Sequence, residues 1–185
     1  MERHRLLEAE KTVLVVIDVQ EAFRSAIPDF SQIVSRISVI INGFEILGLP
    51  MIITEQYPKG LGRTAEELMF SFDTPQNTNE KSTFSAYLSE AFVAALEATG
   101  ARQVLLCGVE THVCVSQTAH DLLAAGYEVH LLTDCASSRF GSDKKAGLKK
   151  MFSSGVIPSS VETALFELMS DSRHAKFKEI QALVK

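Results

Sequence analysis

The stretch RQVLLCGVETHVCVSQTAHDLLAAGYEVHLLTD, residues 102–134, contains two apolar runs separated by a segment of helical period. The runs RQVLLCG (102–108) and YEVHLLTD (127–134) are short and apolar, which is typical of strands buried in a sheet. The intervening segment 114–126 ends at Gly126, and a glycine commonly closes a helix. A strand, a helix and a strand in this order predict two parallel strands joined by a crossover helix.

The same alternation extends in both directions along the chain. Further strands are expected at 12–19 (TVLVVIDV), 50–55 (PMIITE) and, in shorter form, 156–160 (VIPSS). Further helices are expected at 31–48, 88–100, 142–155, 159–169 and 172–184. Capping boxes are expected at Thr64 with Glu67 and at Ser159 with Glu162. Residues 70–84 carry turn residues and little periodicity, which predicts a long loop with at most a short strand.

These elements predict the fold class and the domain organisation. We expect an α/β fold with a doubly wound, mostly parallel sheet of five to six strands and helices on both faces. The length of 185 residues predicts a single domain, 1–185.

Composition bears on the class of partner. The chain has 18 Lys plus Arg and 23 Asp plus Glu, a net charge of −5, so it lacks the basic footprint of a nucleic-acid binder. The one basic cluster, KKAGLKK (144–150), fits a solvated helix face. Because no apolar run approaches the length of a membrane span, no membrane association is expected.

The cysteines and the first residues bear on location. Three cysteines, an odd number, form no disulfide framework and indicate a reducing compartment. Residues 1–11 (MERHRLLEAEK) are charged throughout and contain no apolar core of a secretory signal. We expect a cytoplasmic location, with an organelle such as the mitochondrion left open.

Polar residues follow the expected strands at the points where each strand ends. Asp18 and Gln20 follow the first strand, and residues 55–57 follow the second. Residues 108–114 follow the third strand, and residues 134–139 follow the fourth. In parallel α/β sheets ligands bind outside the carboxyl ends of the strands, so these residues are expected to surround the site.

Three residues could carry chemistry there. Asp18 is either a buried structural hydrogen-bond acceptor or a catalytic carboxylate. Cys114 lies where a helix begins, and helix amides stabilise a thiolate, although a cysteine is more often plain core packing. Lys81, in NEKSTF (79–84), is the candidate cation, although a lysine in a loop is more often a surface residue. Together they would supply a nucleophile, a base and a cation.

Three motifs, in this order, resemble the isochorismatase-like hydrolases, also called the cysteine hydrolase superfamily. The motifs are VVIDVQEAF (15–23), EKSTFSAY (80–87) and CGVETHVCVSQTAHDLL (107–123). The resemblance runs from about Lys11 to the C-terminal helix, and it implies the same doubly wound α/β fold that the periodicity predicts.

The resemblance also implies roles for the three residues. Cys114 is similar to the family's nucleophile, and Asp18 to the base that takes its proton and later gives it to the leaving group. Lys81 is similar to the cation that orients the pair. The implied reaction is hydrolysis of a small amide, carbamoyl or related compound through a covalent thioester, without a cofactor and in a homo-oligomer (dimer or larger).

Further site residues come from the same resemblance and from the strand ends. A cis peptide bond is implied at Val109–Glu110, with the amides of Glu110 and Cys114 forming the oxyanion hole. The candidate pocket walls are Gln20, Phe23, Gln56, Tyr57, Phe84, Thr111 and His112. For Phe23 and Phe84 core packing is an equally good interpretation.

The helix start and Lys81 favour a Cys114 thiol pKa below the unperturbed value of about 8.5, whereas the charge of Asp18 opposes it. We expect either a lowered pKa or a proton shared by the pair. In both cases Cys114 should label faster than Cys107, which falls in a core strand, and Cys135. Cys135 is either a spectator or a resolving thiol for oxidised Cys114.

The sequence also departs from two subgroups. Nicotinamidases carry Asp-x-His after the second strand, where this chain has TEQYPKGLG (54–62), so no metal site is expected. His120 and His130 have no ligand-like spacing and are read as packed or polar residues. True isochorismatases lack Cys114. The chain looks most like the isochorismatase domain-containing proteins, whose substrates are mostly unassigned. The rival functions are a non-catalytic binding or assembly module and, last, an RNA-processing enzyme.

Overall fold

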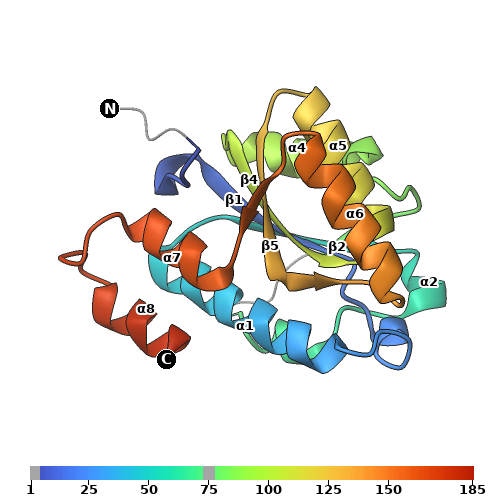
Figure 1. Ribbon diagram of the computed structural model, residues 1–185, viewed down its shortest axis with the longest axis horizontal. Coiled ribbons are helices and arrows are strands. Elements are labelled where there is room, and N and C mark those ends of the chain that lie inside the picture. Colours follow the sequence, from blue (N-terminus) through green and yellow to red (C-terminus); the bar gives the residue numbers. More distant parts are fainter. Residues whose placement is uncertain (1–4, 73–77) are drawn as a thin grey trace.

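In the computed structural model, which describes residues 5–72 and 78–185, six strands form one sheet (Figure 1). The strands are β1 (Thr12–Ile17), β2 (Met51–Gln56), β3 (Thr78–Lys81), β4 (Gln103–Val109), β5 (Glu128–Ser137) and β6 (Ile157–Ser159). Every neighbouring pair is parallel. The predicted fold class, a doubly wound and mostly parallel sheet of five to six strands, is confirmed.

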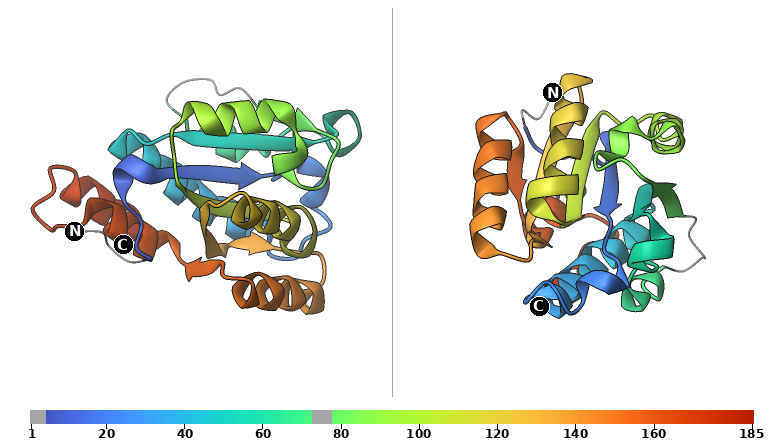
Figure 2. Two further views of the ribbon diagram at one scale, coloured as in Figure 1. Left: turned by 90° about the horizontal axis from the view of Figure 1, so that it is seen from above. Right: turned by 90° about the vertical axis from the view of Figure 1, so that its right-hand side faces the viewer.

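Helices cover both faces of the sheet (Figure 2). One face carries α1 (Phe30–Leu47), α3 (Glu66–Met69), α7 (Val161–Met169) and α8 (Phe177–Val184). The other carries α4 (Glu90–Ala98), α5 (Ser116–Ala124) and α6 (Gly141–Ser153), and the short α2 (Pro58–Leu61) follows β2. In β1, Leu14 and Val16 join the first core cluster while Val13, Val15 and Ile17 join the second. This alternation buries the strand on both faces.

Helix α1 is the most extensive apolar element of the first face. Ile33, Ile37, Ile40, Ile41 and Phe44 recur at helical spacing and are buried. With 18 residues and a mean hydropathy of 1.2, α1 is long and apolar enough to cross a membrane by length and composition alone. The sequence-based expectation that no run approaches that length is therefore wrong. The apolar face of α1 packs on the core, which accounts for its composition.

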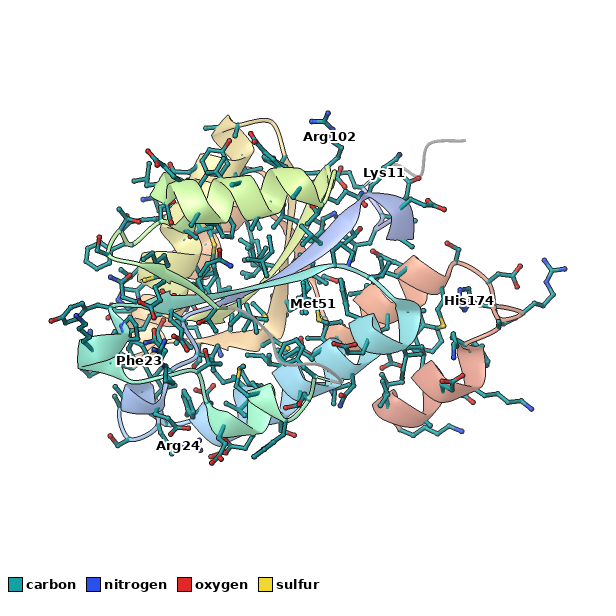
Figure 3. All side chains as sticks on the ribbon, turned by 180° about the vertical axis from the view of Figure 1, so that it is seen from behind. Lys11, Phe23, Arg24, Met51, Arg102 and His174 are labelled. Atoms are coloured by element: carbon teal, nitrogen blue, oxygen red, sulfur yellow. The ribbon has the colours of Figure 1, made fainter. Side chains whose placement is uncertain are left out.

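The strand order places a binding edge within the sheet. The order is β3-β2-β1-β4-β5-β6, so its direction reverses between β1 and β4. In open α/β sheets a ligand binds at such a reversal, outside the carboxyl ends of the strands. Figure 3 shows Phe23 near the end where β1 and β2 finish, with Lys11 and Arg102 at the opposite end.

Some local predictions need correction. The short strand allowed within 70–84 is β3, and residues 73–77 of that segment lie outside the described residues. Thr64 does not cap α3, because its Oγ1 and backbone N–H donate to Glu55 Oε1 at 2.8 and 2.7 Å. Helix α7 is capped by Ser160 in place of Ser159, and the Ser160 hydroxyl accepts from the backbone N–H of Thr163. At Thr64 a tertiary contact overrides the local capping pattern, and at α7 the cap lies one residue later than predicted.

Candidate active site

Asp18 follows β1 directly, at the reversal in strand order. Its backbone is left-handed, with φ of 51°, which is uncommon outside glycine. The side chain is fully buried. Thr54 Oγ1 donates to Asp18 Oδ1 at 2.7 Å, and Lys81 Nζ donates to Oδ2 at 2.6 Å. Both carboxylate oxygens therefore have donors, which compensates the cost of burying the charge.

Lys81 is the last residue of β3 and reaches Asp18 across the end of β2. The residue is only 6% exposed. Besides Asp18, its Nζ lies 2.8 Å from Gln56 Oε1 and 3.1 Å from the carbonyl oxygens of Thr83 and Phe84. The ammonium group is thus surrounded by acceptors, and the surface interpretation of this lysine does not apply.

Cys114 lies in a wide turn that follows β4. The Val109–Glu110 peptide bond is cis, and Thr111–Val115 form a π turn that leads into α5. Gly108 has φ of 119°, and a Cβ there would lie 2.1 Å from the carbonyl oxygen of Ile17. Only glycine lets β4 end this close to β1. The turn places Cys114 at the same edge as Asp18, with 8% of the residue exposed.

The Cys114 thiol lies against the ion pair. Its Sγ is 4.0 Å from Gln56 Oε1, the oxygen that also accepts from Lys81. The pKa of Cys114 is raised to about 12, mainly by burial and then by the charge of Asp18, while Lys81 lowers it and a hydrogen bond with Asp18 raises it further. The predicted lowering of this pKa is wrong, because burial of the thiol and the charge of Asp18 together outweigh the effect of Lys81. The raised pKa keeps the Cys114 thiol protonated at neutral pH, and the alternative of a proton shared with Asp18 stays a prediction.

Gln20 positions Gln56, whose side-chain oxygen lies beside the Cys114 thiol. Gln20 is fully buried, and its Nε2 donates to the carbonyl oxygens of Gln56 and Gly62 at 3.1 and 2.6 Å. Gln20 Oε1 accepts from the Gln56 backbone N–H at 2.7 Å. Gln56 Nε2 in turn donates to the Ser82 carbonyl oxygen at 2.7 Å. Gln20 was predicted as a pocket wall, but it lies behind the wall and positions Gln56.

The aromatic wall candidates divide into two kinds. Tyr57 and Phe84 are 59% and 55% exposed at the site edge. Tyr57 and Lys81 line a surface cavity of about 280 Å³, together with Pro58, Lys59, Glu80 and Ser82. Phe23 is half-buried and packs against the core cluster that contains α1, so the packing interpretation describes it better.

The end of β5 and the start of α6 hold the other side of the nucleophile turn. His112 Nδ1 lies 3.0 Å from Ser138 Oγ, and His112 Nε2 lies 3.8 Å from Asp143 Oδ2. Thr111 is fully buried, and its Oγ1 has no hydrogen-bond partner among the described residues. His112 therefore faces the β5–α6 connection, and Ser138 and Asp143 were not singled out from the sequence.

The sequence did not predict the role of Thr54 or the contact between Glu110 and Arg139, although both Glu110 and Arg139 lie in segments expected to surround the site. Glu110 Oε1 accepts from both the backbone N–H and Nε of Arg139, each at 3.0 Å. The Thr54 hydroxyl holds Asp18. The available signal was positional, since Thr54 ends an apolar strand and Arg139 belongs to the segment after the fourth strand.

His120, His130, Cys107 and Cys135 lie apart from this chemistry. His120 bonds the backbone of its own helix, and His130 pairs with Glu128 near the start of β5. Among residues 5–72 and 78–185, no group of three or more His, Cys, Asp or Glu side chains could hold a metal ion. Cys107 and Cys135 are fully buried, and burial raises the pKa of both thiols.

Residues 12–163 match the isochorismatase domain family. The chain belongs to the isochorismatase family. It is 45% identical over 174 residues to isochorismatase domain-containing protein 1 of Salmo salar, covering 94% of this chain and 61% of that protein. The chain thus spans less than two thirds of that relative. It is 40% identical over 179 residues to isochorismatase domain-containing protein 2 of Danio rerio, covering 96% of this chain and 89% of that protein. The resemblance read from the three motifs is confirmed.

Solved structures share the fold of this family member. One described as MAR1 ribonuclease from Caenorhabditis elegans has a TM-score of 0.90 at 37% identity, covering 97% of this chain and 92% of the other. The YcaC protein from Escherichia coli, described as an octameric hydrolase of unknown specificity, has a TM-score of 0.84 at 22% identity, covering 100% and 97% of the two chains. At that identity the second likeness is one of fold.

Proposed function

We propose that this isochorismatase family member is a cysteine-dependent hydrolase that cleaves a small amide, carbamoyl or related compound through a covalent thioester. The observation that carries the proposal is the buried Asp18–Lys81 ion pair, 2.6 Å long, packed against the Cys114 thiol. A buried ion pair stabilises a fold no better than well-packed apolar side chains of similar volume. Its position beside a thiol at the binding edge therefore supports a chemical role.

The proposed reaction moves one proton between Cys114 and Asp18. Asp18 accepts the thiol proton as the sulfur attacks the carbonyl carbon, which forms the C–S bond and converts the carbonyl oxygen to an oxyanion. The intermediate then collapses, and the departing amine takes the proton from Asp18. Water, deprotonated by Asp18, then attacks the thioester carbon. The C–S bond breaks, the acid is released, and Asp18 returns the proton to the sulfur, which restores the thiol. Lys81 holds the Asp18 carboxyl group in place through these steps by its 2.6 Å contact with Oδ2.

The oxyanion needs donors, and the nucleophile turn is the proposed source. We assign this role to the backbone amides of Glu110 and Cys114, as the family resemblance implies. An oxyanion donor contributes about 2.7–4 kcal/mol of transition-state stabilisation. No cofactor enters the proposed mechanism.

The proposal includes a homo-oligomer. The support is that the E. coli structure of the same fold, YcaC, is described as octameric. Light scattering coupled to size exclusion measures the assembly. A monomer at micromolar concentration would contradict this part of the proposal.

A second candidate is RNA cleavage, which the description of the C. elegans relative suggests. The net charge of −5 argues against it, because phosphate contacts dominate nucleic-acid affinity. A non-catalytic binding module is the third candidate. Such a module has no need of a buried ion pair against a thiol, so the hydrolase remains the preferred function.

The test is a mass-spectrometric screen of amides, carbamoyl compounds, esters and a single-stranded RNA. We expect turnover of an amide or carbamoyl compound and an acyl adduct on the peptide that contains Cys114. Cys114→Ala abolishes both, whereas Cys107→Ala, the matched loss of a thiol outside the site, retains them. Turnover that survives Cys114→Ala would refute the thioester mechanism. RNA cleavage without amide turnover would favour the second candidate.

A further inference from the structure

The side-chain oxygen of Gln56 is held beside the nucleophile by contacts on both ends of the amide. Lys81 Nζ donates to Oε1 at 2.8 Å, while Nε2 donates to the Ser82 carbonyl oxygen at 2.7 Å. A flipped amide would place an NH₂ group against the ammonium, so these two partners assign the oxygen to the side of Cys114. The Gln20 side chain holds the backbone of Gln56, since it accepts from the Gln56 N–H and donates to the Gln56 carbonyl oxygen.

One lone pair of this oxygen lacks a strong donor. A carbonyl oxygen accepts two hydrogen bonds, and Lys81 supplies one of them. On the second side Gln56 Oε1 faces Cys114 Sγ at 4.0 Å, and a thiol is a weak donor. Once the thiol proton has passed to Asp18, that side of the oxygen faces a thiolate and has no donor. An acceptor left unsatisfied at that moment opposes the reaction unless the substrate supplies a hydrogen.

We propose that Gln56 Oε1 accepts a hydrogen bond from an N–H group attached to the reacting carbonyl, so that the site selects amide and carbamoyl compounds over esters of the same acyl group. The inference rests on the proposed function and names its substrate class. An attacking sulfur stands about 3–3.5 Å from the carbonyl carbon. The nitrogen on that carbon then comes within hydrogen-bond range of an oxygen that lies 4.0 Å from Sγ.

An ester has no hydrogen to offer at this position. Its bridging oxygen would face Gln56 Oε1 with lone pairs on both atoms, and the acceptor would stay unsatisfied through the attack. A site built to bond an N–H group rejects an analogue without it for this reason. The hydrogen bond from the substrate N–H to Gln56 Oε1 is stronger during the attack than in the enzyme–substrate complex before it, because the thiol has by then given up its proton and no longer donates to that oxygen.

The test compares two neutral alkylating reagents at Cys114. In both reagents the sulfur displaces iodide from the methylene carbon. The adjacent carbonyl, which stands for the reacting carbonyl of a substrate, carries an N–H group in iodoacetamide and an ester oxygen in methyl iodoacetate. The rate of Cys114 labelling by iodoacetamide, measured by peptide mapping, is divided by the rate with methyl iodoacetate. This ratio is then divided by the same ratio for glutathione, which removes the difference in intrinsic reactivity of the two reagents. We expect a normalised preference of about tenfold for iodoacetamide, the size of effect expected of one additional hydrogen bond.

Variants locate the source of the preference. Gln56→Met removes the acceptor at similar volume and brings the normalised ratio to about one, whereas Gln56→Glu keeps an oxygen there and keeps the preference. Gln20→Met, which releases the backbone of Gln56, lowers the ratio part-way. Gln103→Met is the matched control, because Gln103 is a buried glutamine at the start of β4, at the opposite edge, and it keeps the ratio.

The outcomes separate the two proposals. A wild-type ratio near one, or a ratio that Gln56→Met leaves unchanged, would overturn the role of Gln56 even if Cys114 is the reactive thiol. An equal loss in Gln103→Met would also overturn it, since the preference would then reflect general packing. If Cys114 labels no faster than Cys107 or Cys135, the proposed function itself fails.

Discussion

Replacing Lys81 by methionine would leave a carboxylate buried without its cation. The Lys81 and Asp18 side chains are each 1% exposed and lie 2.6 Å apart. After the substitution Asp18 keeps the Thr54 hydroxyl as its strong donor. Removing one partner of a buried ion pair costs about 3–5 kcal/mol, because the other charge stays desolvated. With a urea m-value of roughly 2–3 kcal/mol/M, the unfolding midpoint should fall by about 1–2 M.

The assay is a double-mutant cycle with Asp18→Asn, measured by urea unfolding. We expect the double variant Asp18→Asn with Lys81→Met to be at least about 2 kcal/mol more stable than additive single effects predict, because neither buried charge remains. Lys59→Met is the control, since Lys59 is an exposed lysine beside the same cavity, and it should stay within about 0.5 kcal/mol of wild type. Additive single effects, or a Lys81→Met midpoint equal to that of Lys59→Met, would refute the reasoning.

Four further outcomes follow from the site and its supports. Because the pKa of Cys114 is raised to about 12, its labelling rate should climb steadily from pH 7 to pH 9, and a plateau near neutrality would contradict the raised value. Asp18→Asn removes a group that raises this pKa, so it should speed labelling at pH 8 while it abolishes turnover. Burial raises the pKa of Glu55, but hydrogen bonds from a backbone amide and a guanidinium bring the net pKa below its usual value. The stability that Glu55 contributes is present above about pH 4.5 and lost as the pH falls through the lowered value, so Glu55→Gln should flatten the fall in urea midpoint between pH 6 and pH 3.5. Gly108→Ala would place a Cβ 2.1 Å from a backbone oxygen and should cost more than about 3 kcal/mol, whereas Gly141→Ala, with open space around it, should unfold at the wild-type midpoint within about 0.5 kcal/mol.

The layered fold was predictable because its signals are local. Apolar runs such as residues 102–108 mark strands buried on both faces, and Gly126 marks the end of a crossover helix. Caps were less predictable. Thr64 satisfies a capping pattern, yet its hydroxyl bonds to Glu55 on a neighbouring strand, a partner that local sequence does not reveal.

The sequence predicted which residues form the candidate site better than it predicted the role of each residue. Asp18 and Cys114 could be named because each follows a predicted strand, where a parallel sheet gathers its site residues. Lys81 was named as a lysine in a polar loop, and the family resemblance implied its role. Gln20 was predicted as a wall and is a buried support, because a contact with the backbone of Gln56 joins residues 36 positions apart. Ser138 and Asp143 were not predicted to hold His112 for the same reason.

The sequence by itself determined the α/β fold, the order of its elements and the three residues that meet at the binding edge, since period and strand ends depend on near neighbours along the chain. Only the tertiary structure decided the state of the thiol. The pKa of Cys114 depends on burial and on which charge lies closest, and the fold pairs Lys81 with Asp18 and withdraws all three from water. Electrostatic interactions depend on distance and surrounding dielectric in three dimensions, so the direction of that shift could not be obtained from the order of the residues.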